Sequence, residues 1–513
     1  MEKFGIERGG SKGLASSRRG FLQGAAAMGL ASVLPLRAAA QDGMPSGAVI
    51  FGNAEPPTAN YWDPAAGFGL VDEQVASLVH DSLLSFDQEG NIGPGLAVSH
   101  EVKSDKVVAL TLREGVTFHD GSPLTAEDVK ASIDRLGAGG LAQAMVVTPG
   151  ITVEIKSPTE IEVVSPDAFG VILSALAYIK ILPKANIDNP DNFGKGGLGT
   201  GPYKFVSYDG TSVILEANAD YWGGAPGIKT VTFRYIEDAQ ARINALLSGQ
   251  VDILTRVSAE DLSRVKDNDE FYINSQTPPA QIVAIYQHNG PLGDLKLRQA
   301  IAHAINREGI AASIMQGANA VGFSSLPTTS SLYEPLEPKF EYDLDKARAL
   351  MAESAYPDGA TLRMSTSTLV PNQIEIDQII AASLESIGIK VEVERLEVGA
   401  FRTSYNTYDI NLNTLAIFDY DPDFVLGFYV GGTAEAVFHY HDPVYEELYA
   451  AQRAATAETR QAAVTAAARH LWENQVTLYL SDETWHFIVN KRVQGYVRAP
   501  LIGENLLGQA TVA

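Results

Sequence analysis

The first clear repeat of apolar positions lies at residues 72–85 and predicts a helix. Val75, Leu78, Val79 and Leu83 recur there at intervals of three, one and four residues. Residues at such intervals share one face of a helix with 3.6 residues per turn. We therefore expect this segment to pack its apolar face on a core.

Similar patterns predict alternating strands and helices along the rest of the chain. A helix start is predicted at Thr125, because Asp128 follows three residues later in the spacing of a capping box. Runs of β-branched and aliphatic residues predict strands. The predicted strands are 47–53, 107–112, 151–155, 160–164, 203–206, 213–217, 230–235, 361–365, 390–395, 476–480 and 486–489, and the further helices are 239–247, 298–306, 343–354, 374–387, 443–455 and 459–473. This irregular alternation predicts a mixed α/β protein of several lobes.

The N-terminal pattern is typical of an export signal. Adjacent Arg18 and Arg19 are followed by Phe21, then by an apolar stretch over about 24–36, and three alanines end at Ala40. A charged segment, a short apolar segment and a small-residue cleavage site define a signal peptide. The arginine pair resembles the twin-arginine signal, which predicts passage through the twin-arginine translocase. We expect cleavage near Ala40 and a periplasmic location.

Composition narrows the classes of partner. The chain has 513 residues and a net charge of −24, and nucleic-acid binders need an excess of Lys and Arg to neutralise phosphates. Nucleic acid is therefore excluded as an expected partner. The chain has no cysteine, which excludes disulfides, thiolate ligands and lipidation at cysteine.

A set of short phrases carries a family resemblance. In chain order these are IGPGLA (92–97), LTLREGVTFHDG (110–121), LTAEDV (124–129), GTGPYKF (199–205), NADYW (218–222), LLSGQVDI (246–253), LRQAIAHAINRE (297–308) and YDLDKARALMAE (342–353). Their order and spacing resemble family 5 of the extracellular solute-binding proteins, the peptide/nickel/opine class of ABC importers. The resemblance covers nearly the whole chain after the signal.

The resemblance implies an α/β, two-lobed periplasmic-binding-protein fold of class II, in its large three-domain type. A hinge and an interlobe cleft belong to that fold. The segments it implies are a signal peptide (1–40), domain I of lobe 1 in three parts (41–85, 186–275 and 481–513), an inserted domain II (86–185), and domain III as lobe 2 (276–480).

The resemblance also implies the function. We expect a receptor that delivers a small molecule to an ABC permease and its ATPase, with a peptide or peptide-like compound as the ligand class. An opine, an oligosaccharide and a metal chelate remain open as alternatives, and we expect a monomer.

Aromatic residues in two segments are candidates for ligand contact, because small-molecule clefts combine aromatic walls with a few polar groups. Tyr61, Trp62 and Phe68 follow the first strand, and Trp485 and His486 stand between the two last strands. Relatives often place ligand-facing residues in these segments. The alternatives are a loop packed on its own lobe and a tryptophan in the core.

A third candidate segment contains Phe418, Asp419 and Tyr420. In peptide binders that the chain resembles, an acidic residue three positions before Asp-Pro anchors the peptide amine, and here that position is Phe418. A shift of one residue on an extended backbone turns a side chain to the other face. Phe418 as an apolar wall and Asp419 as a cation anchor both stay open.

Motifs of catalysis are missing from the sequence. The chain has no G-x-S-x-G turn and no H-E-x-x-H pair, which would indicate a serine hydrolase or a zinc hydrolase. We expect no enzyme activity, no cofactor and no bound metal; a periplasmic enzyme remains the remote alternative.

Overall fold

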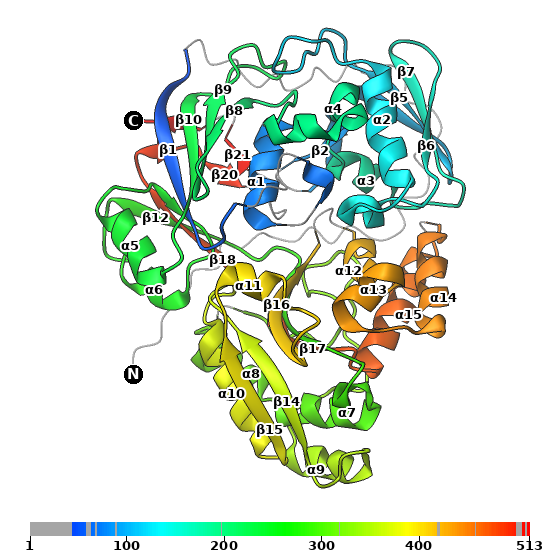
Figure 1. Cartoon of the computed structure of the whole chain (residues 1–513), viewed down its shortest axis with the longest axis vertical. Helices are drawn as coiled ribbons and strands as arrows, with labels where there is room; N and C mark the ends of the chain where they lie inside the picture. The colour runs from blue at the N-terminus through cyan, green and yellow to red at the C-terminus, as the bar shows by residue number, and fades with distance from the viewer. Residues whose placement is uncertain are drawn as a thin grey trace, which may run out of the picture. The chain divides into compact units, whose positions relative to one another are not determined.

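The strands of the chain gather into one large sheet in each of two lobes (Figure 1). The computed structural model describes residues 44–57, 63–66, 69–87, 90–195, 197–317, 319–417, 421–456, 458–498, 505–507 and 510–513. These residues all belong to one compact unit. The predicted signal at Arg18, Arg19 and Phe21 lies outside them.

The first lobe is built on a mixed seven-stranded sheet. In sheet order its strands are β12 (Phe271–Gln276), β18 (Trp485–Asn490), β11 (Ile253–Leu254), β1 (Ser46–Asn53), β10 (Ile228–Tyr235), β9 (Ser212–Ala217) and β8 (Tyr203–Tyr208). Strand β1 runs parallel to β10 and β11, and β18 pairs with β11 and β12 in the antiparallel sense. The chain therefore returns to the first lobe after completing the second.

A smaller antiparallel sheet and several helices complete the first lobe. The sheet has the order β4 (Ala97–Ser104), β5 (Val107–Leu112), β7 (Glu160–Val164) and β6 (Thr152–Ile155). The helices are α1 (Leu70–Val79), α2 (Ala126–Gly137), α3 (Ile172–Tyr178), α4 (Lys184–Asp188), α5 (Ala239–Leu247) and α6 (Ala259–Ser263), with 3-10 turns η2 (Pro64–Ala66), η3 (Ala142–Val146) and η4 (Pro190–Lys195). Short strand pairs are β2 (Leu84–Phe86) with β3 (Ile92–Pro94), β19 (Val493–Gln494) with β22 (Thr511–Val512), and β20 (Val497–Arg498) with β21 (Asn505–Leu506).

The second lobe is built on a mixed five-stranded sheet covered by helices. Its strands are β15 (Ile389–Arg395), β14 (Ala360–Thr366), β16 (Ile410–Ala416), β13 (Ala280–Tyr286) and β17 (Thr477–Asp482). Its helices are α7 (Leu295–Ala304), α8 (Arg307–Ser313), α9 (Leu344–Glu353), α10 (Gln373–Glu385), α11 (Val398–Arg402), α12 (Asp423–Gly427), α13 (Gly431–Phe438), α14 (Pro443–Arg453) and α15 (Arg460–Glu473), with the 3-10 turn η5 (Pro291–Gly293). All seven residues of β13 are buried, as expected for a strand covered on both faces.

Two chain segments cross between the lobes side by side. One joins β12 to β13, and the other joins β17 to β18. The Oγ1 atoms of Thr277 and Thr484 lie 3.0 Å apart and link the two segments by a hydrogen bond. Paired crossing segments of this kind allow two lobes to rotate as rigid bodies about a hinge.

Most predicted elements are present, and the largest error concerns α1. The capping box of Thr125 and Asp128 is confirmed at the start of α2. The helix predicted over 72–85 ends instead at Val79, because His80 adopts an extended conformation. Leu83 remains buried, and Leu84 begins strand β2. An apolar side chain beyond the helix end therefore continued the helical pattern by chance.

Candidate functional site

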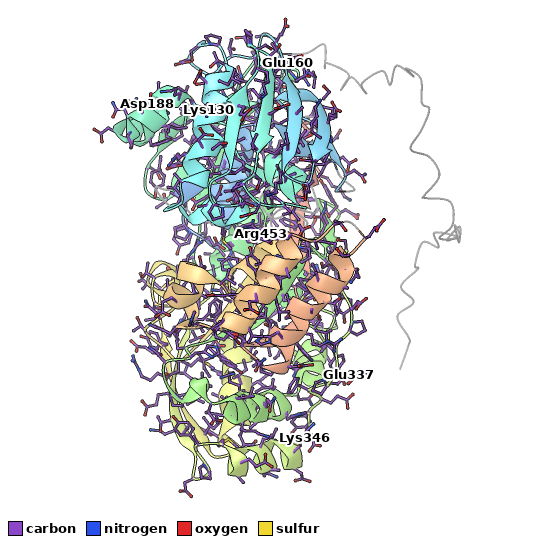
Figure 2. All side chains as sticks on the ribbon, turned by 90° about the vertical axis from the view of Figure 1, so that its right-hand side faces the viewer. Lys130, Glu160, Asp188, Glu337, Lys346 and Arg453 are labelled. Atoms are coloured by element: carbon purple, nitrogen blue, oxygen red, sulfur yellow. The ribbon has the colours of Figure 1, made fainter. Side chains whose placement is uncertain are left out.

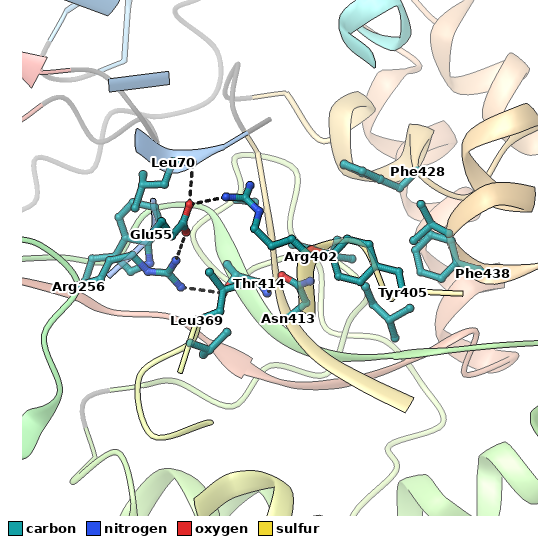
Figure 3. A pocket seen from close by; sticks show the side chains of 16 residues that line it. Glu55, Leu70, Arg256, Leu369, Arg402, Tyr405, Asn413, Thr414, Phe428 and Phe438 are labelled. Atoms are coloured by element: carbon teal, nitrogen blue, oxygen red, sulfur yellow. Dashed lines mark hydrogen bonds and ion pairs between the residues drawn. The ribbon is translucent and has the colours of Figure 1, made fainter. Parts of the chain in front are cut away.

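A cavity of about 330 Å³ lies where the two lobes meet (Figure 3). The first lobe and the second crossing segment contribute Glu55, Leu70, Arg256 and Trp485 to its lining. The second lobe contributes Ile285, Leu369, Val370, Arg402, Tyr405, Asn413, Thr414, Leu415, Ala416, Phe428, Val437 and Phe438. A molecule held in this cavity would contact both lobes at once.

The ends of strands and helices place the polar residues at the cavity. Glu55 follows the end of β1, and Arg256 follows the end of β11, the parallel neighbour of β1 in the sheet. Parallel neighbours end at the same edge of a sheet, so both side chains reach the same place. Arg402 is the last residue of α11 in the second lobe. Thr414 lies on β16, next to Asn413.

Four charged side chains form one network across the lobes. Arg256 donates from Nε and Nη2 to Glu483 Oε1, at 3.1 and 2.6 Å, and its Nη1 lies 3.6 Å from Glu55 Oε1. Arg402 Nη1 donates to Glu55 Oε2 at 2.9 Å. Thr414 accepts from Arg256 Nη2 at 3.0 Å and donates to Glu483 Oε2 at 2.8 Å. The network therefore joins the first lobe, the crossing segment and the second lobe.

The network is buried and balanced in charge. The side chains of Arg256 and Glu483 are only 8% and 3% exposed. Two guanidinium groups face two carboxylates, which suits a buried site because charges removed from water need partners there. The carboxylate of Glu55 raises the pKa of Arg402 above its ordinary value. Arg256 also takes a left-handed backbone conformation, with φ of 50°, which is uncommon for a residue with a side chain.

The other end of the cavity is apolar. Phe428, Val437 and Phe438 line it from the region of α12 and α13, and Leu415 lines it from β16. Tyr405 adds a hydroxyl, whose pKa is raised by burial. The cavity therefore combines a charged end, whose groups bind one another, with an apolar end that carries a few neutral hydrogen-bonding groups.

The structure places the predicted contact residues in three ways. Trp485 lines the cavity, and the Arg256 guanidinium lies 4.9 Å from the centre of one of its rings. His486 is the next residue on β18 and instead hydrogen-bonds Ser275 through Nδ1 at 2.8 Å, because neighbouring strand residues point to opposite faces. Tyr61, Trp62, Phe68, Phe418, Asp419 and Tyr420 lie outside the described residues.

Sequence reasoning missed the charged network entirely. Glu55 and Arg402 are 347 residues apart, and Arg256 and Glu483 are 227 apart. None of the four belongs to a phrase that carries the family resemblance. Only the folded chain brings them together, so no local pattern could have indicated them.

Within the described residues, no group of three or more His, Asp or Glu side chains is arranged to hold a metal ion. No helix in the same part of the chain is long and apolar enough to cross a bilayer.

Two lobes, paired crossing segments and a cavity with walls from both lobes define a two-lobed solute-binding protein. Residues 91–436 match the model of the bacterial extracellular solute-binding proteins, family 5. The chain belongs to this family.

Comparison with known proteins gives relatives of modest identity. The dipeptide-binding protein of Escherichia coli (strain K12) is 26% identical over 451 residues, which cover 80% of this chain and 84% of that protein. The glutathione-binding protein GsiB of Pectobacterium atrosepticum is 25% identical over 346 residues, 66% of this chain and 67% of that protein. The crystal structure of a dipeptide-binding protein from Pseudoalteromonas sp. SM9913 with Met-Leu has a TM-score of 0.84 at 21% identity, covering 91% of this chain and all of that one.

Proposed function

We propose that the protein is the periplasmic receptor of an ABC importer and encloses a peptide or peptide-like molecule in the interlobe cavity. The observation that carries this proposal is the cavity lining, which both lobes supply. A ligand there stabilises the closed arrangement, and the closed protein then delivers it to the permease and its ATPase. We propose stoichiometric binding without turnover. An opine, an oligosaccharide or a metal chelate is the alternative ligand class.

The chemistry of the cavity favours a ligand with an apolar side chain. Its volume of about 330 Å³ lies at the small end of the range for ligand pockets. Both carboxylates of the network already bind guanidinium groups, so this end of the cavity is neutral as a unit. Phe428 and Phe438 offer an apolar surface at the other end. A small peptide with an apolar residue fits this division better than a highly charged chelate.

We propose the sequence-predicted residues as further contacts. Trp485 lines the cavity, and so does Ala416, two residues before Phe418. This closeness in sequence supports a role for Phe418, Asp419 and Tyr420 at the same cavity. Tyr61, Trp62, Phe68 and His486 are proposed on the family resemblance.

We propose that residues 1–40 are a twin-arginine signal, cleaved near Ala40, and that the mature protein is a periplasmic monomer. The arginine pair, the short apolar stretch and the terminal alanines support this export route. We keep the predicted domain borders at residues 85, 185, 275 and 480 as part of the proposal.

Thermal unfolding of the purified mature protein tests the ligand class. A panel of dipeptides, tripeptides, opines, oligosaccharides and nickel chelates should give one class that raises the melting temperature. A ligand at a hundred times its dissociation constant adds about 2.7 kcal/mol to the free energy of unfolding. A rise with a peptide supports the proposal, and a rise with only another class replaces peptide by that class. No rise with any member of the panel contradicts the binding role proposed here.

Removal of the Tyr405 hydroxyl tests whether the ligand binds in the cavity. Tyr405→Phe keeps the ring that lines the cavity and removes its oxygen, so we expect ligand affinity to fall about tenfold, the effect of one lost hydrogen bond of about 1.4 kcal/mol. Tyr408→Phe is the matched control, because the Tyr408 hydroxyl donates to Glu394 at 2.8 Å and Tyr408 is not part of the cavity lining. Equal affinities of the two variants would place the ligand elsewhere.

A further inference from the structure

A second junction between the lobes is centred on Arg453, the last residue of α14 (Figure 2). Its Nη1 donates to the carbonyl oxygen of Val147 in the first lobe at 3.2 Å. Its guanidinium carbon lies 4.8 Å from the centre of the Phe169 ring, a distance at which cations are attracted to aromatic faces. Its own carbonyl oxygen accepts from the backbone N–H of Gly170 at 3.3 Å. One residue of the second lobe thus makes three contacts with the first.

The same arginine is fixed within its own lobe by Asp423. Arg453 Nη2 lies 3.1 Å from Asp423 Oδ2, and Gln452 Nε2 donates to the other carboxylate oxygen at 2.5 Å. The backbone N–H of Asp423 donates to Asp421 Oδ1 at 2.8 Å, and Arg460 forms an ion pair with Asp421. Asp421 and Asp423 are therefore held in place by two arginines, Arg453 and Arg460, and by Gln452.

This arrangement connects the start of α12 to the first lobe. Asp423 holds Arg453, which contacts the first lobe at Val147 and Phe169. Phe424, the next residue, packs its ring edge-on against Tyr178 of the first lobe, with centroids 6.4 Å apart. The start of α12 is therefore tied to the first lobe through two neighbouring residues, Asp423 and Phe424.

The first lobe approaches this junction closely. A Cβ atom added to Gly170 would lie 2.9 Å from the carbonyl oxygen of Ala455 in the second lobe. Real Cβ contacts of that length are essentially not observed, so any side chain at residue 170 would push the lobes apart. The backbone contact of Gly170 with Arg453 depends on this small residue.

We propose that Arg453 is a positioning residue that favours the closed arrangement of the two lobes. The proposal extends the receptor function proposed above and rests on it for the ligand step alone. Arg453 does not line the cavity, so its effect on affinity would act through the ratio of closed to open molecules. When only the closed form holds the ligand, the apparent dissociation constant is the intrinsic one divided by the fraction of closed molecules, so it rises as that fraction falls.

Fluorescence energy transfer between the lobes measures this ratio directly. The chain has no cysteine, so dyes can be attached at two introduced sites without removing any residue. Ala138→Cys at the end of α2 and Glu435→Cys on α13 place one dye on an exposed position of each lobe. Single-molecule measurements would be made with and without Met-Leu, and the dissociation constant would be measured by calorimetry.

Two variants change the junction, one in each lobe. Arg453→Met removes the charge and keeps most of the side-chain volume, and Gly170→Ala inserts a methyl group without removing any contact group. Arg469→Met is the control for the first, because Arg469 lies on α15 and pairs within its own lobe with Glu473. Gly432→Ala is the control for the second, because a Cβ atom there meets no other atom within 4 Å.

We expect each junction variant to lower the ratio of closed to open molecules about tenfold in the absence of ligand, and the controls to leave it unchanged. Affinity for a bound peptide should fall in proportion to the measured fraction of closed molecules, with faster dissociation. Unchanged ratios in both junction variants would overturn the role of Arg453, even if the wild type binds peptide. A changed ratio in a protein that binds no peptide would support the junction and reject only the receptor function.

Discussion

Two junctions join the lobes, and their charges are arranged differently. At the cavity, Arg256 and Arg402 meet Glu55 and Glu483, so each charge is buried against an opposite one. At the second junction, Arg453 meets a carbonyl oxygen and an aromatic ring of the first lobe, and its carboxylate partner lies in its own lobe. Both junctions are present in the same closed arrangement.

The difference determines what each junction costs to open. Removing Arg256 from the cavity network leaves the buried Glu483 without its charged partner, which is strongly unfavourable. Separating Arg453 from the first lobe leaves neutral groups of that lobe behind, the Val147 carbonyl, the Phe169 ring and the Gly170 N–H, while Asp423 keeps its hydrogen bond from Gln452. The Arg256–Glu483 pair therefore serves mainly to hold the crossing segment in place, whereas the second junction and the Arg402–Glu55 contact separate when the lobes open.

The largest expected effect is that of Arg256→Met. Among the described residues, this change leaves the Glu483 carboxylate with only the Thr414 hydroxyl as a partner, and it removes one partner of Glu55. Breaking a buried pair in this way costs about 3–5 kcal/mol. Urea unfolding should register that loss, whereas Arg264→Met, on an exposed residue, should change stability very little.

A double variant tests whether the unpaired charge of Glu483 causes the loss of stability in Arg256→Met. Adding Glu483→Gln to Arg256→Met removes the unpaired charge, so we expect part of the lost stability to return. If the double variant is less stable than Arg256→Met alone, the charge balance proposed for the cavity network is wrong.

The second-largest expected effect is a pH dependence of the free energy of unfolding. It originates at Glu73, near the second junction. Glu73 on α1 accepts hydrogen bonds from Tyr178 at 2.8 Å and Gln143 at 3.0 Å, and Tyr178 packs on Phe424 of the other lobe. Burial raises the pKa of Glu73 from 4.5 to about 7, opposed by these hydrogen bonds and by Lys180 and reinforced by Asp72. The folded protein therefore holds this proton more tightly than the unfolded chain does.

The sign of the pH effect follows from that difference. Stability falls wherever the folded state binds more protons than the unfolded state as pH rises, which here means between about pH 4.5 and 7. The loss is about 3 kcal/mol, from roughly 1.4 kcal/mol for each unit of pKa. Glu73→Gln should remove this part of the dependence in urea unfolding at pH 5 and pH 8.

Asp377 supplies the comparison for Glu73. It is fully buried on α10 in the second lobe, and burial raises its pKa from 3.8 to about 7. Asp377→Asn should reduce the pH dependence of stability to a similar extent without changing lobe closure. If Glu73→Gln leaves the pH dependence of stability unchanged, Glu73 does not hold a proton in the folded protein as described here.

The elements of the fold were largely predictable because they depend on local patterns. The run of β-branched and aliphatic residues in β5 and the capping box at Thr125 are read from a few consecutive residues. Strands β4, β11, β12, β13 and β16 of the larger sheets were missed. In β16 the apolar–polar alternation of Ile410–Asn413 is broken at Thr414, although most of the strand is buried. Tertiary burial determines such a strand, and a local pattern does not.

The candidate site was less predictable because it joins distant residues. Trp485 was selected from its place between two late strands, and the structure puts it at the cavity. Glu55, Arg256 and Arg402 had no local feature that separates them from surface charges. Their partners become visible only when β1, β11 and α11 are placed in space.

The third effect is that of Arg402→Met, at the more exposed end of the cavity network. Arg402 is 22% exposed, and after its removal Glu55 still accepts from the backbone N–H of Leu70 at 3.2 Å and lies beside Arg256. We expect a loss of about 2 kcal/mol, the value of a hydrogen bond to a charged group, in the same urea experiment. A loss as large as that of Arg256→Met would mean that the two arginines contribute equally.

The smallest effect concerns Trp485, whose ring faces the Arg256 guanidinium. Trp485→Phe keeps an aromatic ring at the cavity, and we expect a stability loss of about 1 kcal/mol, in the range of a cation–π contact.

The chain has four tryptophans, so ligand entry can be followed by fluorescence. The ligand-induced change should be smaller in Trp485→Phe than in Trp222→Phe, because Trp222 lies outside the cavity lining and binds Asp81. Arg453→Met should keep the full change at saturating ligand, because it alters closure and not the cavity wall. A change that is equally reduced in Arg453→Met would show that the two junctions cannot be separated.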